Sequence, residues 1–592
     1  MKLLLVAVNA KYIHSNLAVY CLRAYAGKHG FADQVSLAEY TINHSEEDIL
    51  REIYKEKADV IAFSCYIWNI EIILRLINEL KKVQPEAKLW LGGPEVSYDS
   101  ERRLKLTPGL EGIMIGEGEQ TFLELVQHYT LGEPALKKIK GIAYRDNNLI
   151  RITEERELLA LSDVPFPYVD IKNFKNRIIY YESSRGCPFS CSYCLSSVEK
   201  RIRFRDLSLV KQELLFLLEQ QVPQVKFVDR TFNCNKEHAM AIWQFIKEND
   251  NGITNFHFEI SADLLTDEEL SFLATLRIAQ VQFEIGVQST NPDTVAAIRR
   301  RMDLKLLRKN VDRIRVARNI HQHLDLIAGL PNEDYKTFEQ SFHDVYEMKP
   351  DQLQLGFLKV LRGSPMEAES KDFGIVYRDN PPYEVLYTRQ LSYEELLKLK
   401  GICEMVEVYY NSGQFTNAIG YLEHYYPTPM KLYEELAGYY ESKHMDMQAH
   451  SRIRRYELLL DFFQEKVLRF EAGSDHAPDP RSDRESNFFQ DYASDHSKPE
   501  KLKLFEEILL MDLFLREDMK SRPPFAMDRI QKNHKNLYDE YRREQILVHI
   551  ETFQYDIETS VKNGEVMMRE STVIFNYSER DPITKSATLI RR

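Results

Sequence analysis

The sequence lacks any long hydrophobic run. No segment reaches the roughly 18 consecutive apolar residues that a membrane-spanning helix needs. The apolar segment Leu3–Val8 is too short for the hydrophobic part of a signal peptide, and Lys11 and His14 follow it in place of small residues. We therefore interpret Leu3–Val8 as a buried strand and expect no membrane partner.

The chain also has fewer basic than acidic residues. The chain has 78 Lys and Arg residues against 91 Asp and Glu residues, a net charge of −13. Binding a phosphate backbone requires a basic face, so this balance disfavours a nucleic acid as the main partner. Hydrophobic residues make up 44% of the sequence and charged residues 29%, which excludes global disorder. A chain of 592 residues predicts about three or four domains.

Cysteine is scarce but unevenly distributed. Three of the seven cysteines fall within eight residues, at Cys187, Cys191 and Cys194, with the spacing C-x3-C-x2-C. Thiolates this close cannot all pair as disulfides without strain, but they can converge on one metal centre. Three ligands are too few for a structural zinc site, which usually has four. They are enough for a 4Fe-4S cube in which one iron is left open to a substrate or cofactor.

These residues resemble the cluster motif of the radical S-adenosylmethionine (SAM) superfamily. The resemblance implies that the open iron binds the amino and carboxylate groups of SAM. An electron from the reduced cluster would then cleave SAM to methionine and a 5′-deoxyadenosyl radical. Tyr193, the aromatic residue before the last cysteine, would lie near the adenine. Cluster thiolates must stay reduced, which implies a reducing, cytoplasmic and anaerobic setting.

The alternative at these cysteines is a zinc site. Its fourth ligand would be Cys234 or His238, both distant in the sequence. The spacing C-x3-C is not a usual zinc half-site, so the sequence favours the cluster.

Residues 1–130 alternate between strand and helix patterns. The expected strands are short and mostly apolar, at Leu3–Val8, Val35–Tyr40, Val60–Phe63, Leu89–Leu91 and Ile113–Ile115. Ser45 and Asp48 predict a capping box at the start of one intervening helix. Five such units predict an α/β fold, a doubly wound, flavodoxin-like (Rossmann-like) parallel sheet. Ligands of such sheets bind at the carboxyl ends of the strands.

Glycine-rich loops follow two of these strands, Gly92-Gly93-Pro94-Glu95 and Gly116-Glu117-Gly118-Glu119. Glycine pairs let a backbone approach a bulky ligand closely. Just ahead of a radical SAM motif, this pattern resembles the cobalamin-binding domain of the cobalamin-dependent radical SAM enzymes. The resemblance implies cobalamin contacts at Ser64, Gly92, Gly93, Glu117 and Gly118.

The Asp-x-His-x-x-Gly motif, which supplies an imidazole to cobalt in other cobalamin proteins, is absent from the sequence. Many radical SAM relatives also lack it. His14 and His44 stand in other contexts, and we interpret His14 as a hydrogen-bonded loop residue. The alternative is a vestigial, purely structural domain.

Residues 131–175 are expected to form a connector. The segment Gly141–Ile150 predicts a β-hairpin turned at Asn147-Asn148. Pro165 and Pro167 then predict an extended linker, because proline excludes helix and restrains its neighbour.

Residues 176–362 return to the alternation of strands and helices. The expected strands are Ile178–Glu182, Val225–Val228, Phe256–Ile260, Val281–Ile285, Leu324–Ala328 and Leu353–Leu358. Six such units predict a partial TIM-like barrel, the fold that radical SAM enzymes share. Barrel active sites lie at the C-terminal face of the strands, where the cysteine segment also emerges.

Several strand ends of this barrel match the radical SAM family. By resemblance, the residues that line the SAM site are Tyr193, Asp229, Glu259, Ser261, Glu284 and Gln288. Asp229 is expected to accept from the ammonium group of SAM, and Ser261 to bond its carboxylate. Glu259 or Glu284 would accept from the ribose hydroxyls. For each polar residue alone, a helix cap or a loop hydrogen bond is an equal alternative.

Two basic segments flank this predicted site, Lys200–Arg205 and Arg299–Arg301. Guanidinium groups there are able to hold the SAM carboxylate or an anionic substrate. Such runs are more often solvated surface. We interpret Arg299–Arg301 as a helix C-terminus whose charge compensates the helix dipole.

Residues 363–592 carry none of the motifs shared with the family. Helical patterns dominate to about residue 470, and residues 473–502, rich in Asp, Ser, Pro and Arg, are expected to form a mobile loop. Strand-like segments follow at Val548–Ile557 and Val566–Tyr577. The lone Cys403 is interpreted as a packing residue. By resemblance we expect a mainly helical accessory domain that shapes the substrate site.

The sequence therefore predicts a cobalamin-dependent radical SAM enzyme with a 4Fe-4S cluster, SAM and cobalamin as cofactors. By resemblance, the radical would abstract hydrogen from an unactivated carbon of a small-molecule or peptide substrate, and methylcobalamin would deliver a methyl group. A flavodoxin- or ferredoxin-type protein would supply the electron.

Two alternatives remain open. The first is a cobalamin-independent radical SAM enzyme, methylthiotransferase-like or cyclase-like. Methylthiotransferases of transfer RNA carry three more cluster cysteines in the N-terminal domain, whereas only Cys21 and Cys65 precede residue 130 here. The second is a non-catalytic, metal-stabilised binding module, which metal analysis would separate from an enzyme.

Overall fold

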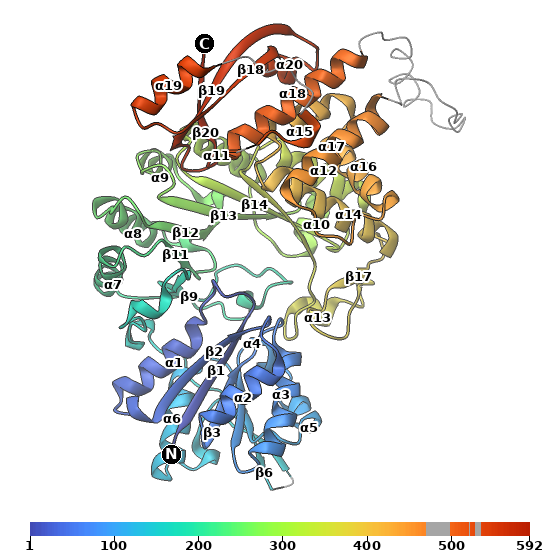
Figure 1. Cartoon of the computed structure of the whole chain (residues 1–592). Helices are drawn as coiled ribbons and strands as arrows, with labels where there is room; N and C mark the ends of the chain where they lie inside the picture. The colour runs from blue at the N-terminus through green and yellow to red at the C-terminus, as the bar shows by residue number, and fades with distance from the viewer. Residues whose placement is uncertain (148, 469–497, 520, 527–533) are drawn as a thin grey trace. The chain divides into compact units, whose positions relative to one another are not determined.

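The computed structural model describes every residue except 148, 469–497, 520 and 527–533 (Figure 1). The chain divides into two compact units, Met1–Asp334 with Gly356–Ser392 and Tyr335–Leu355 with Tyr393–Arg592. Among the described residues, no helix combines the length and the apolar character needed to cross a membrane.

The first unit begins with a seven-stranded sheet in the order β2-β1-β3-β4-β5-β6-β7. Its strands are β1 Leu3–Asn9, β2 Val35–Thr41, β3 Val60–Ser64, β4 Lys88–Gly92, β5 Gly112–Met114, β6 Ile142–Asp146 and β7 Leu149–Ile152. Strands β1 to β5 pair in parallel, which confirms the predicted doubly wound sheet. β1 is buried along its whole length, as expected of a strand between two neighbours in a covered sheet.

Six helices accompany this sheet: α1 Leu17–Lys28, α2 Glu46–Lys55, α3 Ile70–Val83, α4 Pro94–Ser97, α5 Ser100–Leu106 and α6 Glu119–Leu131. α1 packs beside α6, and α2 packs beside α3 (Figure 1). Apolar side chains of α2 and α3 join those of β1, β3 and β4 in one core. One half of the predicted capping box is present, because the Ser45 hydroxyl accepts from the Asp48 backbone N–H at 3.1 Å, whereas the Asp48 carboxylate accepts from the Ser45 hydroxyl at 2.6 Å.

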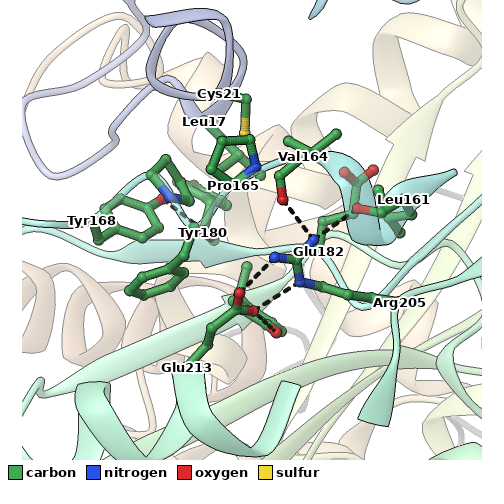
Figure 2. Close-up of a pocket in the computed structure, with 13 residues that line it drawn as sticks. Leu17, Cys21, Leu161, Val164, Pro165, Tyr168, Tyr180, Glu182, Arg205 and Glu213 are labelled. Carbon is green, nitrogen blue, oxygen red and sulfur yellow. Dashed lines mark hydrogen bonds and ion pairs between the residues drawn. The ribbon is translucent and has the colours of Figure 1, made fainter. Parts of the chain in front are cut away.

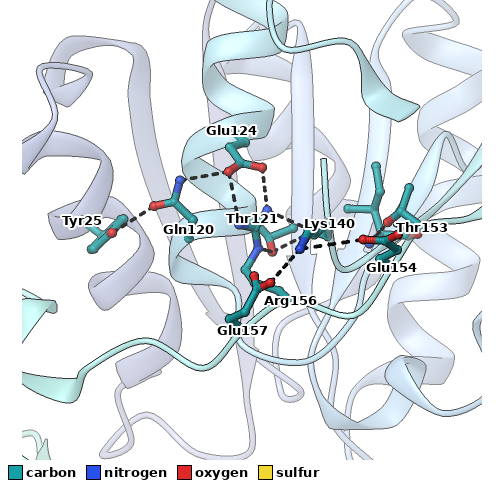
Figure 3. A network of polar contacts seen from close by, with 10 residues as sticks. Tyr25, Gln120, Thr121, Glu124, Lys140, Thr153, Glu154, Arg156 and Glu157 are labelled. Carbon is teal, nitrogen blue, oxygen red and sulfur yellow. Dashed lines mark hydrogen bonds and ion pairs between the residues drawn. The ribbon is translucent and has the colours of Figure 1, made fainter. Parts of the chain in front are cut away.

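The predicted hairpin joins this sheet. β6 pairs antiparallel with both β5 and β7, so the sheet continues past residue 130. The chain after β7 is fixed to α6 by Arg156, whose guanidinium donates to Glu124 at 2.5 Å and to the Thr121 hydroxyl at 2.9 Å. Lys140 extends the same network by donating to Glu157 at 2.7 Å (Figure 3). The connector is therefore held against the first sheet domain.

The second sheet has the order β15-β14-β13-β12-β11-β8, and its strands β8 to β14 belong to the first unit. Its strands are β8 Ile179–Tyr181, β11 Gln224–Phe227, β12 Asn255–Ile260, β13 Val281–Gln288, β14 His321–Ala328 and β15 Gln352–Phe357. The pairings from β8 to β14 are parallel, and the predicted partial barrel is confirmed. β13 alternates between buried apolar residues and partly exposed polar residues or glycine, so one face packs in the core and the other lines the barrel interior.

The helices between these strands are α7 Leu207–Glu219, α8 Lys236–Glu248, α9 Asp267–Leu273, α10 Pro292–Ala297 and α11 Leu304–Ala317. Two further short strands, β9 Ser184–Arg185 and β10 Arg203–Phe204, pair antiparallel beside the barrel. Residues 356–392 add α13 Pro365–Glu369 and the hairpin β16 Val376–Tyr377 with β17 Val385–Tyr387.

The second unit is mainly helical, as predicted. Its helices are α12 Tyr335–Tyr346, α14 Tyr393–Val406, α15 Thr416–Leu422, α16 Pro429–Ser442, α17 Arg452–Phe462, α18 Lys498–Arg516, α19 Lys535–Arg543 and α20 Ile557–Asn563. The predicted strand-like segments are present as β18 Val548–Tyr555 and β19 Met568–Arg580, which form an antiparallel sheet with β20 Ala587–Arg591. Of the loop predicted at 473–502, residues 473–497 lie outside the described residues, and the remainder begins α18 instead of a loop.

Candidate cluster and cofactor site

The segment with the three cysteines is a closed loop, residues 186–202, called the cluster loop below. The β9–β10 ladder closes it at its base, with Arg185 opposite Arg203 and Ser184 opposite Phe204. Gly186 begins the loop with φ of +100°, and a Cβ there would lie 2.5 Å from the Arg201 carbonyl oxygen. Only glycine fits this position without moving backbone.

The three cysteines meet at one cavity. Cys187, Cys191 and Cys194 are free thiols, the first two buried, and all three line a cavity of about 190 Å³ at the barrel strand ends. Among the described residues, no three His, Cys, Asp or Glu side chains are close enough to bind a single metal ion. A zinc ion needs each thiolate sulfur within about 2.3 Å of one atom. A cube places each thiolate on a different iron, so this donor set fits a 4Fe-4S cluster better.

The two residues considered as a fourth zinc ligand lie outside this cavity's lining. The ring of His238 bonds the Ser183 hydroxyl at 3.1 Å through Nε2. Burial lowers the pKa of His238 to about 4, so its ring is neutral at neutral pH. Cys234 is half-buried, and burial raises the pKa of its thiol to about 11, which disfavours the thiolate that zinc binds.

The structure brings five of the six predicted SAM residues to the same cavity: Tyr193, Glu259, Ser261, Glu284 and Gln288. They come from the cluster loop, from β12 with the residue after it, and from β13. Parallel strands end at one face of a barrel, which is why residues far apart in sequence gather there.

Asp229 is placed elsewhere. Its buried carboxylate accepts from the Ser183 backbone N–H at 3.0 Å and from the hydroxyls of Ser183 and Ser184 at 2.6 Å each. Burial raises the pKa of Asp229 to about 6 against the effect of these donors. Asp229 therefore anchors the strand that leads into the cluster loop.

The sequence interpretation of Arg299–Arg301 does not hold for its last two residues. α10 ends at Ala297, Arg299 has φ of +55°, and Arg300 and Arg301 line the cavity. The partly buried Arg300 guanidinium lies 4.0 Å from the Cys191 sulfur and 3.4 Å from the Tyr193 hydroxyl, and also donates to the Gly286 carbonyl. A cation therefore faces the Cys191 sulfur, and the chain reversal after α10 places it there.

Charges on the barrel strands distinguish the two cavity glutamates. Burial opposes ionisation of Glu284, but His257 at 2.9 Å and Lys226 at 3.0 Å outweigh it and lower the pKa of Glu284 to about 2. Glu259, its neighbour on β12, makes no hydrogen bond within the described residues, and desolvation raises its pKa to about 7. The Glu284 carboxylate is therefore ionised and already bound to His257 and Lys226. The Glu259 carboxyl group is available to bind a ligand.

The pH dependence of stability should report on Glu259. The raised pKa means that the folded protein holds the Glu259 proton more tightly than the unfolded chain does, so this contribution is present at low pH and lost as pH rises through about 7. In thermal unfolding, we expect the difference between the Tm of wild type and the Tm of Glu259→Gln to decrease as the pH is raised from about 5 to about 8. Exposed Glu86 supplies the control variant Glu86→Gln, and a difference that is the same at every pH would contradict the assignment.

The predicted cobalamin residues lie at the carboxyl edge of the first sheet. Ser64 and Gly92 end β3 and β4, and the Ser64 hydroxyl accepts from Asn16 at 3.2 Å. A Cβ at Gly93, which has φ of +111°, would lie 2.5 Å from the Cys65 carbonyl oxygen. The chain itself therefore requires glycine at position 93.

Glu117 and Gly118 precede α6 at the same edge. The Glu117 carboxylate pairs with Arg185 and Arg203, and a Cβ at Gly118 would lie 3.0 Å from a Leu22 methyl group. Their contacts with cobalamin stay predictions. The interpretation of His14 is confirmed, because its Nδ1 bonds the Tyr180 hydroxyl at 2.6 Å.

Sequence reasoning missed an aromatic pair in the loop after β3. The rings of Tyr66 and Trp68 stack with centroids 4.4 Å apart and an interplanar angle of 6°. The indole of Trp68 donates to the Val8 carbonyl and remains 43% exposed. An exposed flat surface at the ligand edge of a doubly wound sheet suits a flat cofactor. In the sequence, two aromatic residues two positions apart directly after an apolar strand were the feature that could have predicted this stack.

A second, smaller cavity has a structural role (Figure 2). Its volume is about 30 Å³, room for about one water molecule. Buried Arg205 donates to both oxygens of Glu213 and to the carbonyls of Leu161 and Val164 at 2.7 and 2.8 Å. The basic segment 200–205 is therefore not wholly solvated, because Arg205 is buried and binds the linker at Leu161 and Val164 to the barrel.

Comparisons with known proteins agree with this arrangement. Residues 3–126 match the model of the B12 binding domain, and residues 181–345 match that of the radical SAM superfamily. The chain is a radical SAM protein with a B12-binding domain. Residues 371–575 match a further family described only as a protein of unknown function, DUF4080.

This radical SAM protein resembles several curated proteins over about half of its length. It is 26% identical over 319 residues to "Uncharacterized methyltransferase PH0819" of Pyrococcus horikoshii, covering 52% of this chain and 68% of the relative. It is 26% identical over 351 residues to the cobalamin-dependent radical SAM methyltransferase TokK of Streptomyces tokunonensis, covering 53% and 48% respectively. The chain thus spans only about half of the length of TokK.

Solved structures show the same fold. The cobalamin-dependent radical enzyme OxsB, with aqua-cobalamin and SAM bound, has a TM-score of 0.57 at 14% identity and covers 95% of this chain and 83% of its own. TsrM from Kitasatospora setae has a TM-score of 0.55 at 16% identity and covers 65% and 79%. The predicted fold class is confirmed, and the two domain matches agree with the predicted cobalamin and SAM cofactors, so a cobalamin-independent enzyme is not favoured.

Proposed function

We propose that this radical SAM protein methylates an unactivated carbon of a small-molecule or peptide substrate. When bound, the cluster supplies the electron that splits SAM into methionine and a 5′-deoxyadenosyl radical, and cobalamin supplies the methyl group. The convergence of three free thiols with five predicted SAM residues on one cavity carries this proposal. Its support from relatives is the series of methyltransferase names at 25–26% identity.

The residues take separate roles in this proposal. Cys187, Cys191 and Cys194 hold the cluster, and Arg300 beside Cys191 compensates thiolate charge. Tyr193, Glu259, Ser261, Glu284 and Gln288 bind and orient SAM in the cavity. Asp229 fixes the approach to the cluster loop. Cobalamin contacts are assigned to Ser64, Gly92, Gly93, Glu117 and Gly118, with the Tyr66–Trp68 stack as an additional surface.

We propose the domain limits 1–130 for cobalamin binding, 131–175 for the connector, 176–362 for the barrel and 363–592 for a substrate-shaping accessory domain. A flavodoxin- or ferredoxin-type reductant and a reducing, cytoplasmic setting complete the proposal, because free cluster thiols oxidise in air.

Anaerobic purification with metal and product analysis tests the function. We expect about four irons and four sulfides per chain, with one cobalt after reconstitution with cobalamin. A strong chemical reductant and SAM should then yield 5′-deoxyadenosine. A single zinc per chain without iron, or no 5′-deoxyadenosine from fully loaded protein, would contradict the proposal.

Ring formation is a second candidate reaction. The chain is 25% identical over 354 residues to the anaerobic magnesium-protoporphyrin IX monomethyl ester cyclase of Cereibacter sphaeroides. Methyl-labelled SAM separates the two reactions. Transfer of the label to cobalamin and then to an added candidate substrate supports methylation, whereas 5′-deoxyadenosine formed without methylated cobalamin supports the cyclase-like reaction.

A further inference from the structure

Four charged residues join the loop before α6 to the cluster loop. Arg185 contacts Glu119 at 2.8 Å and Glu117 at 3.3 Å, and Arg203 donates to Glu117 at 3.0 Å. We call Glu117, Glu119, Arg185 and Arg203 the acid–arginine bridge. It connects the B12-binding domain with the barrel within one compact unit.

The bridge is largely withdrawn from water and remains charged. Its side chains are between 6% and 21% exposed. The Arg185 guanidinium contacts three carboxylates, those of Glu117, Glu119 and Glu182. Burial opposes ionisation of Glu117, yet Arg203 and Arg185 lower its pKa. Partly buried ion pairs of this kind are weakly screened by salt and hold their partners in fixed geometry.

Both arginines lie at the base of the cluster loop. Arg185 and Arg203 oppose each other in the β9–β10 ladder, and Cys187 follows Arg185 by two residues. Arg185 also pairs with Glu182 at 2.8 Å on the strand side. A displacement of the carboxylates therefore acts on the ladder that fixes the first cluster ligand.

Glu117 and Glu119 belong to the loop at residues 116–119, which we assign to the cobalamin site. Gly116 has φ of +75°, and a Cβ there would meet no atom within 4 Å, so space remains beside this backbone. Glu117 and Glu119 extend from the same four residues to the arginines. One short loop thus combines an open glycine backbone at the ligand edge with two carboxylates bound to the cluster loop.

We propose that the acid–arginine bridge is a positioning device that couples occupancy of the cobalamin site to the conformation and electrostatics of the cluster loop. This inference rests on the proposed function, since it takes the loop at residues 116–119 as part of the cobalamin site. Coupling between two sites is reciprocal, so cobalamin should order the cluster loop and the assembled loop should favour cobalamin.

Hydrogen exchange measured by mass spectrometry tests the coupling. Protein reconstituted with iron and sulfide is compared with and without hydroxocobalamin, under anaerobic conditions. In wild type, hydroxocobalamin should slow exchange in peptides covering residues 186–203. In the double variant Arg185→Gln with Arg203→Gln, which removes the bridge from its barrel side and leaves every residue assigned to cobalamin in place, cobalamin should still bind, but this protection should be lost.

The matched control is Arg177→Gln. Arg177 pairs with Glu39 at 2.7 Å across the same two domains, with similar burial, but does not contact the cluster loop. This variant should keep the cobalamin-dependent protection. Wild type that binds cobalamin without added protection, or a double variant that retains it, would overturn the coupling alone. Wild type that binds no cobalamin would overturn the proposed function and the coupling with it.

The reduction potential of the cluster gives a second readout that needs no cobalamin. Reduction adds an electron, so removing a nearby negative charge favours the reduced cluster and removing a positive charge opposes it. We expect the potential to rise in Glu117→Gln, to fall in Arg185→Gln, and to stay unchanged in Arg177→Gln and in Glu117→Asp, which keeps the charge. A purely structural role would shift both bridge variants in the same direction, and that result would overturn the proposal.

Discussion

Replacing Cys191 with alanine is expected to remove the iron–sulfur cluster from this protein. Cys191 is one of three thiols around a single cavity, and no further cysteine among the described residues lines it. A cube with two protein thiolates leaves two irons exposed and is lost during purification. We expect iron to fall from about four per chain to near zero and 5′-deoxyadenosine formation to vanish, as measured by metal analysis and chromatography. Cobalt binding should persist, because the B12-binding domain has its own core.

Cys234→Ala is the matched control for this prediction. Cys234 is also near the cavity, because its backbone N–H donates to the carbonyl of Thr231, a lining residue, at 3.0 Å, but Cys234 itself does not line the cavity. The variant should keep its iron and its SAM cleavage. Loss of metal in both variants would instead support a zinc site with Cys234 as the fourth ligand.

The architecture of residues 1–362 was predictable because its signals are local. Buried strands such as Leu3–Asn9 appear in the sequence as unbroken apolar runs, and β13 appears as strict alternation. The cysteine spacing likewise needs no tertiary information. Strand ends of a parallel barrel meet at one face by topology, so five of the six predicted SAM residues reach one cavity.

The residues that sequence reasoning misplaced depend on contacts between distant segments. Asp229 lies next to a strand end like its neighbours, but two serines before the cluster loop take its carboxylate. Arg300 follows a short helix, and its direction is set by a turn at Arg299 and by the Gly286 carbonyl. At Gly93, whose contact with cobalamin stays a prediction, the backbone of Cys65 also requires glycine. Periodicity and spacing carry none of this information.

Buried charge partners were the largest gap. The segment Lys200–Arg205 reads as a basic surface run, whereas Arg203 and Arg205 are nearly buried and bind Glu117 and Glu213. The acids lie 86 and 8 residues away in the sequence, and only the folded chain, in which Arg203 belongs to the β9–β10 ladder, shows the pairing. A charge run shows which residues are present but not which of them the fold withdraws from water.

Arg205→Met is expected to destabilise the barrel strongly. Arg205 and Glu213 have side chains only 7% and 9% exposed, and Arg205 donates to both carboxylate oxygens of Glu213. Removing the guanidinium leaves the carboxylate with the Tyr181 hydroxyl at 2.6 Å as its remaining hydrogen-bond donor among the described residues. Breaking a buried pair in this way costs about 3–5 kcal/mol. Chemical denaturation of the holoprotein, monitored by circular dichroism, should show the loss.

The double variant Arg205→Met with Glu213→Leu separates charge burial from packing. It leaves no uncompensated charge, so it should recover most of the stability lost in the single variant. Lys105→Met serves as a surface control, because Lys105 and Glu101 are 63% and 55% exposed and such pairs contribute about 1 kcal/mol or less. If the double variant is as unstable as Arg205→Met, the anchoring of the Leu161 and Val164 carbonyls, and not the ion pair, holds the linker to the barrel.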